Sequence, residues 1–107
     1  MVHYKLPSMS DSRPMHGVQI RMARAALGWS VAKLAERAKL DPSTVKRVEA
    51  TLGSAQTERD LEWRAERRMA SLEAITATLQ RAGIAFFHDA GGVGVRLKMS
   101  GSHIELR

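Results

Sequence analysis

The sequence predicts a mainly helical fold that ends in a short β-hairpin. Over Gly17–Gly53 the apolar residues recur every three to four positions, as they do on one face of a helix, in three short stretches. The same spacing returns between Leu61 and Leu79. After Gly83 the pattern changes to two short runs rich in strand-forming residues, which flank a glycine-rich turn. These observations predict a helical body followed by two antiparallel strands.

The length and composition of the chain predict one small domain. It has 107 residues and no cysteine, so neither disulfides nor thiolate chemistry is expected. Residues 1–15 are polar, contain two prolines and show no periodicity, which predicts a flexible arm. We expect a helical domain over 16–82 and a hairpin with a tail over 83–107.

No apolar run approaches the roughly 20 residues of a membrane span, and no secretory signal is recognisable. We therefore expect a cytoplasmic protein without a membrane partner.

The first predicted helix runs from Gly17 to Leu27 and ends at Gly28, a residue able to adopt positive φ. Its inward face is predicted to consist of Ile20, Ala23, Ala26 and Leu27. Ser30 then offers a side-chain oxygen to cap a second helix. The buried stripe of that helix is predicted to consist of Val31, Leu34, Ala35 and Ala38.

A tight turn over residues 39–41, with Leu40 pointing inward, separates the second helix from a third. Asp41 is expected to cap the exposed amides of the third helix, and Pro42 suits its first position. This helix extends to about Ala50. It is expected to bury Val45 and Val48 and to expose Ser43, Thr44, Lys46 and Arg47. The last two helices are therefore spaced as a helix-turn-helix.

Residues 54–70 carry many charges of both signs, which sum to zero. Leu61, Ala65 and Met69 repeat every four residues, and Leu72, Ile75 and Leu79 continue nearly the same stripe. Two interpretations remain open: one long helix from about 57 to 82, or two helices with a break near Ser71. We favour two, because Ser71 can act as a second cap. Gly83 is expected to end the last helix.

The predicted strands are 84–87 and 93–99, joined by a turn at 89–92. Phe86 and Phe87 are adjacent in a strand, so their side chains point to opposite faces and cannot share one core. A two-stranded hairpin is also marginal on its own and leaves open edges. We therefore expect a two-fold homodimer with the 57–82 region and the hairpin in its interface. The interface residues are predicted to be Phe86, Phe87, Val95 and Leu97.

Positive charge is concentrated in one part of the chain. Residues 17–53 hold seven basic and three acidic residues, a balance of +4 in a chain with a net charge of +6. A basic face on a compact helical unit indicates a polyanionic partner, most simply double-stranded DNA.

Several ordered pieces of the sequence resemble the XRE (phage-repressor-like) helix-turn-helix regulators. These pieces are Gln19-Ile20-Arg21-x-Ala23-Arg24, Gly28-Trp29-Ser30, Leu34-Ala35-Glu36-Arg37-Ala38, Ser43-Thr44-Val45 and Val48-Glu49. The ending Ala82-Gly83-Ile84-x-Phe86, followed by Gly94-Val95-Arg96-Leu97, resembles one small-regulator branch of that family. The resemblance covers about residues 17–53 and 71–98.

The resemblance implies a lambda-repressor-like bundle of about five helices, with the third helix in the major groove of DNA. It implies a buried ion pair between Arg24 and Glu49. It also places the base-reading positions at Pro42, Ser43 and Arg47, with Thr44 and Lys46 nearer phosphate.

The chain departs from the family pattern at three places. Val31 stands where many members have a phosphate-binding glutamine, so that contact is lost. Lys39 replaces the usual turn glycine, and a left-handed conformation there would cost roughly 1 kcal/mol. The 54–70 segment is longer or more charged than in the branch. These departures bear on the affinity for DNA and on the geometry of the fourth helix.

Arg47 is the side chain best suited to read sequence, because a guanidinium can bond O6 and N7 of one guanine. The alternatives are a phosphate contact or a solvated charge. Ser43 and Thr44 can bond phosphate or touch a thymine methyl, or can simply reflect the preferences of a helix start. Pro42 fits a structural role as well as a base contact. The expected phosphate-attracting residues are Arg21, Lys33, Lys39 and Lys46.

No enzymatic or metal site is expected. The four histidines are scattered, and the sequence offers no nucleophile with a matching base. Residues 89–94 are not a phosphate loop, because no helix with a Lys-Ser/Thr pair follows them. We expect no cofactor and no metal.

The sequence thus predicts a dimeric, sequence-specific DNA-binding regulator, most simply a repressor that blocks polymerase by occupying its site. One alternative is an antitoxin whose tail or 54–70 segment neutralises a toxin protein. Another is a helical adaptor that has lost DNA binding, which the residues at Val31 and Lys39 would allow.

Overall fold

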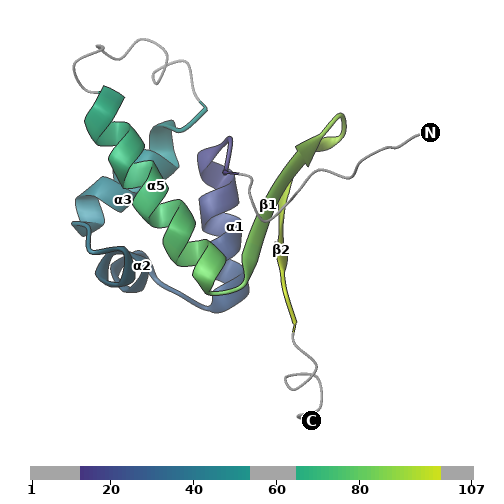
Figure 1. Cartoon of the computed structure of the whole chain (residues 1–107), viewed down its shortest axis with the longest axis horizontal. Coiled ribbons are helices and arrows are strands. Elements are labelled where there is room, and N and C mark those ends of the chain that lie inside the picture. The colour runs from purple at the N-terminus through teal and green to yellow at the C-terminus, as the bar shows by residue number, and fades with distance from the viewer. Residues whose placement is uncertain (1–12, 54–64, 100–107) are drawn as a thin grey trace.

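The structure is a computed structural model that describes residues 13–53 and 65–99. These residues form four helices and one two-stranded antiparallel sheet, namely α1 (Gly17–Leu27), α2 (Val31–Ala38), α3 (Pro42–Thr51), α5 (Ala65–Arg81), β1 (Ile84–Asp89) and β2 (Gly92–Leu97). Helix α5 lies across the three N-terminal helices, and the hairpin stands at the edge of the bundle beside α1 (Figure 1). The predicted mainly helical fold with a C-terminal hairpin is confirmed. The described residues hold four helices where the family resemblance implies about five, and residues 54–64 lie outside the described residues.

Helices α1 and α2 end in the same way. The residue after each helix has a left-handed backbone conformation, which turns the chain so that its next N–H groups bond to carbonyls of the last helical turn. Gly28 has φ +71° and Lys39 has φ +62°. At the end of α2, the Lys39 N–H donates to the Glu36 carbonyl (3.2 Å) and the Leu40 N–H to the Ala35 carbonyl (2.9 Å), which is the Schellman pattern. The same two bonds follow Gly28. The glycine adopts this conformation without a Cβ penalty, whereas Lys39 carries the strain of roughly 1 kcal/mol expected for a non-glycine residue.

The helix starts are built from the residues that the sequence indicates, with one difference. The Ser30 hydroxyl accepts from the Lys33 N–H at the start of α2 (3.0 Å). Asp41 holds the cap position of α3, but its carboxylate accepts no bond from the helix amides, so that expectation is wrong. The Asp41 backbone carbonyl already accepts from the Thr44 N–H (2.9 Å), and the carboxylate accepts instead from the Ser43 hydroxyl (3.2 Å).

Helix α5 runs without a break from Ala65 to Arg81, so the interruption expected near Ser71 is wrong. A serine inside a helix costs only about 0.5 kcal/mol relative to alanine, which is less than the burial of one large apolar side chain contributes. Met69, expected on the buried stripe, is 42% exposed. The expected helix start near Thr57 and the stripe residue Leu61 lie outside the described residues.

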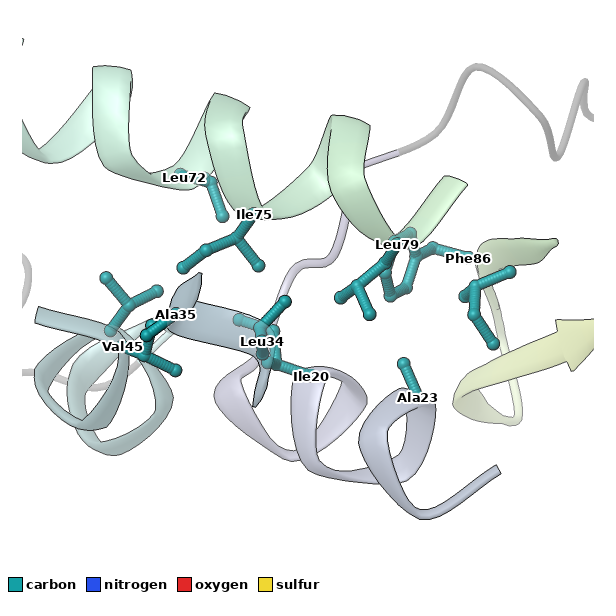
Figure 2. Packing of buried hydrophobic residues seen from close by; sticks show 11 residues of the cluster. Ile20, Ala23, Leu34, Ala35, Val45, Leu72, Ile75, Leu79 and Phe86 are labelled. Carbon is teal, nitrogen blue, oxygen red and sulfur yellow. The ribbon is translucent and has the colours of Figure 1, made fainter. Parts of the chain in front are cut away.

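Side chains from all the described helices and from the hairpin form one core. Figure 2 shows Leu72, Ile75 and Leu79 pointing from α5 onto residues of the first three helices. The wholly buried large apolar residues include Ile20, Leu34, Ile75, Leu79 and Phe86. Ala26, expected in the core, is exposed because it lies about 120° around the helix from Ile20. Phe86 closes the core at the hairpin end.

In the hairpin, Ile84 pairs with Leu97 and Phe86 with Val95, so these four residues share the face that meets the core. Phe87 lies on the opposite face, opposite Gly94 in the register. A Cβ built on Gly94 would lie 2.7 Å from the tip of the Phe87 ring. The ring therefore covers the glycine across the strands, an arrangement that protects a weak position in a small sheet.

Residues 13–15, which belong to the predicted flexible arm, lie against the helical body. Pro14 is buried, and the Met15 N–H donates to the side-chain oxygen of Gln19 (2.6 Å). Arg13 approaches Glu73 of α5 at 4.0 Å. The ordered body thus begins before residue 16, and residues 1–12 of the predicted arm lie outside the described residues.

Candidate nucleic-acid interface

An ion pair fixes α3 against α1. The Arg24 Nε donates to Glu49 Oε2 at 2.7 Å and the Nη2 to Oε1 at 3.1 Å, a two-point contact between guanidinium and carboxylate. The third nitrogen, Nη1, donates to the Trp29 carbonyl at 3.2 Å. Glu49 is 7% and Arg24 18% exposed, so the pair is largely removed from solvent. The pair expected from the family resemblance is present.

Helix α1 also approaches the C-terminal half of α3 closely at Gly17. A Cβ added at Gly17 would collide with the Glu49 carbonyl oxygen, and the Gly17 N–H donates to the Leu52 carbonyl at 3.1 Å. Arg21 falls between Gly17 and Arg24 on this helix face and is exposed. Because Gly17 and Arg24 both meet Glu49, Arg21 lies toward the C-terminal half of α3. A helix rise of about 10 Å separates Glu49 from Pro42 at the start of α3.

Helix α3 divides cleanly into a buried and an exposed face. Val45, Val48 and Glu49 are buried, which fixes the rotation of the helix about its axis. The exposed face comprises Pro42, Ser43, Lys46 and Arg47, with Thr44 half-buried at its border. These residues are brought together by the helical period, as expected. The Ser43 hydroxyl is occupied by Asp41, which leaves Lys46 and Arg47 as the strongest donors on this face.

The basic residues of α2 lie at its two ends. Lys33 is half-buried in the first turn, while Lys39 is exposed in the turn that leads into α3. Val31 packs against the core, so this position offers no polar contact to a ligand. The guanidinium of Arg37 lies 5.2 Å from the centre of the Trp29 ring, a cation–π contact that directs this basic group toward Trp29.

A groove of about 370 Å³ lies between α3 and α5. Its lining includes Arg47 of α3 together with Arg67 and Arg68 of α5. The sequence reasoning missed the two α5 arginines, because the acidic residues around them bring the charge of the 54–70 segment to zero. Their arrangement beside Arg47 depends on how α5 packs against α3, which has no local sequence signal.

The residues expected at a dimer interface do not form one surface. Phe86 is wholly buried inside the chain, so its assignment to an interface is wrong. Val95 and Leu97 are half-buried on the same core-facing side of the hairpin. Phe87 alone of the four lies on the outward face. The reason is that the hairpin packs on α1 and α5 with the face that carries Phe86.

In residues 13–53 and 65–99, no three His, Cys, Asp or Glu side chains come together as a metal-ligand set. The helices in these ranges are too short or too polar to cross a bilayer. When the chain was compared with protein-family models, with curated proteins and with solved structures, nothing matched significantly.

Proposed function

We propose that this chain is a sequence-specific regulator that binds double-stranded DNA, most simply a repressor that acts by occupancy. The observation that carries the proposal is the exposed basic face of α3, in a helix-turn-helix whose other face is locked into the core. A helix held in this way presents fixed side chains to the edges of the bases in the major groove. We assign no catalytic chemistry and no cofactor to the chain.

In this proposal Arg47 reads sequence. Its guanidinium has no ion-pair partner among the described residues, so both of its outer nitrogens are available to O6 and N7 of a guanine. A good bidentate contact of this kind discriminates by about 1–3 kcal/mol against the wrong base. Lys46, one position earlier on the same exposed face, supplies attraction to phosphate.

Lys33, Lys39 and Arg21 add phosphate attraction around α3. Since Arg21 lies toward the C-terminal end of the helix and Lys39 precedes its start, the two flank opposite ends of the reading face. Phosphate contacts on both sides fix the position of α3 in the groove without reading sequence themselves.

We further propose that the active form is a homodimer. The hairpin has only two strands among the described residues, and Phe87 lies on the face opposite Phe86. A strand of a second hairpin placed beside an open edge would pair that edge. Such a dimer would bind an inverted repeat with half-site centres about 10 base pairs apart.

Selection of bound sequences from random DNA tests the function directly. We expect enrichment of an inverted repeat by the unmodified chain and loss of one guanine preference in Arg47→Ala. Arg47→Lys separates reading from charge, because lysine keeps the charge but not the two-point fork. If Arg47→Lys selects the same sequence with the same preference, Arg47 is a phosphate contact.

Arg81→Ala is the matched control, since Arg81 is an exposed arginine at the far end of α5. We expect it to select the unmodified sequence. Failure of the folded, unmodified chain to bind any DNA at low salt would refute the proposed function. Light scattering that shows only monomer at micromolar concentration would refute the proposed dimer.

A further inference from the structure

The groove between α3 and α5 is lined mainly by arginine and hydroxyl side chains. The residues that form it are Thr44, Arg47, Val48, Thr51, Arg67, Arg68 and Ser71. Three guanidinium groups and three hydroxyls thus surround a concave space of about 370 Å³, and none of the described lining residues is acidic. A volume of this size is within the range of small-ligand sites.

Two of the arginines bring charge to the groove that no described residue compensates. Neither Arg47 nor Arg67 forms a side-chain hydrogen bond or an ion pair with any described residue, and both are exposed. The acidic residue of α3, Glu49, is buried and already neutralised by Arg24. Two like charges beside one groove repel each other, and an anion between them relieves that repulsion.

The hydroxyls add neutral donors to the same site. Thr44 and Ser71 are half-buried on α3 and α5, and neither side chain makes a hydrogen bond within the described part of the chain. Thr51 differs, because its hydroxyl donates to the Arg47 carbonyl at 2.8 Å. A ligand in the groove would therefore meet guanidinium and hydroxyl donors from two helices.

We propose that this groove binds a phosphate group. Guanidinium groups match the geometry of phosphate oxygens, and hydroxyls complete the coordination. A backbone phosphate of DNA and a free phosphorylated molecule offer the same chemistry. The first source rests on the proposed function: a DNA phosphate in the groove would then bind Arg67, beside Arg47 whose outer nitrogens contact the base.

The first experiment needs no DNA. Tripolyphosphate is titrated into the full chain and followed by backbone NMR. We expect saturable shifts at Thr44, Arg47, Arg67 and Ser71. Arg67→Ala should weaken this binding about tenfold, as the loss of one charge-assisted contact does, whereas Arg81→Ala should leave it unchanged. Both substitutions are at exposed positions and should preserve the fold.

The second experiment measures the salt dependence of DNA binding. If a DNA phosphate occupies the groove, Arg67→Ala lowers the slope of log K against log salt by about 0.9, and Arg81→Ala does not. Tripolyphosphate binding with an unchanged slope supports the site with a free phosphate as its ligand. Tripolyphosphate binding by a chain that binds no DNA refutes the proposed function and keeps the phosphate site.

The proposal is overturned if neither measurement responds to Arg67→Ala. It is also overturned if tripolyphosphate shifts residues outside the groove with equal affinity, because the attraction then reflects net charge and not a built site.

Discussion

Replacing Arg24 with alanine removes the cation that neutralises a buried carboxylate. The Glu49 side chain is 7% exposed and makes both of its Arg24 contacts within 3.1 Å. Removing one partner of a buried pair costs about 3–5 kcal/mol, because the remaining charge has neither a partner nor water. Since Arg24 itself is 18% exposed, some water reaches the pair. We therefore expect the lower end, a loss of about 3 kcal/mol in the free energy of unfolding.

The two partners should not be equivalent. Glu49→Ala leaves a guanidinium that keeps its bond to the Trp29 carbonyl at 3.2 Å and has more access to solvent than the carboxylate had. We expect this variant to lose about 2 kcal/mol. The double variant should lose less than the sum of the two, with a coupling energy of at least about 1.5 kcal/mol.

Urea unfolding followed by circular dichroism measures these losses, provided that the slopes of the variants agree. Arg21→Ala is the control, because Arg21 is exposed one turn earlier on the same helix and should change stability by less than about 0.5 kcal/mol. A loss under about 0.5 kcal/mol for Arg24→Ala would match an exposed pair and refute the reasoning. Additive single losses would refute it as well.

Three further substitutions test other parts of the fold. Gln19→Met removes the four hydrogen bonds made by a wholly buried side-chain amide and should lower the free energy of unfolding by about 2–4 kcal/mol. Amide hydrogen exchange in the hairpin should become faster, and unchanged exchange would contradict this. Lys39→Gly should raise stability by about 1 kcal/mol by relieving the left-handed strain, while Lys39→Ala should not; equal values would show that no strain is stored. Gly17→Ala should cost about 1–3 kcal/mol because its Cβ would meet the Glu49 carbonyl, and a neutral thermal unfolding result would show that α1 can move away from α3.

The parts of the fold that the sequence predicts are those that local chemistry controls. Gly28 ends α1 because a residue without a Cβ adopts positive φ freely, and Ser30 starts α2 because its hydroxyl replaces a missing acceptor. Two short strands joined through Ala90-Gly91 follow from β-propensity and turn chemistry. The exposed face of α3 follows from its period. Each of these depends on residues within about four positions of one another.

The parts that could not be predicted depend on residues far apart in the chain. Gln19 is a polar residue in a helix, and nothing nearby indicates that it is buried. Its Nε2 donates to the Phe87 and Gly94 carbonyls at 3.0 Å each, contacts that span about seventy residues. The approach of Arg67 to Arg47 likewise depends on the packing of α5. Alternation along a strand predicts that Phe86 and Phe87 point to opposite faces, but only the packing of the hairpin decides which of them enters the core.

Helix α1 connects the two halves of the proposed mechanism. Arg24 binds Glu49 of α3 on one side of α1. On another side, the Gln19 side-chain nitrogen donates to the hairpin. The Gln19 side-chain oxygen accepts from the Met15 and His16 N–H groups. In α1 these two side chains are five positions apart, about 140° around the axis. The helix proposed to read DNA and the hairpin proposed to pair two subunits are therefore attached to the same helix by polar contacts that have defined directions. The separation of two reading helices in a dimer, and with it the spacing of the half-sites, would then be set by α1.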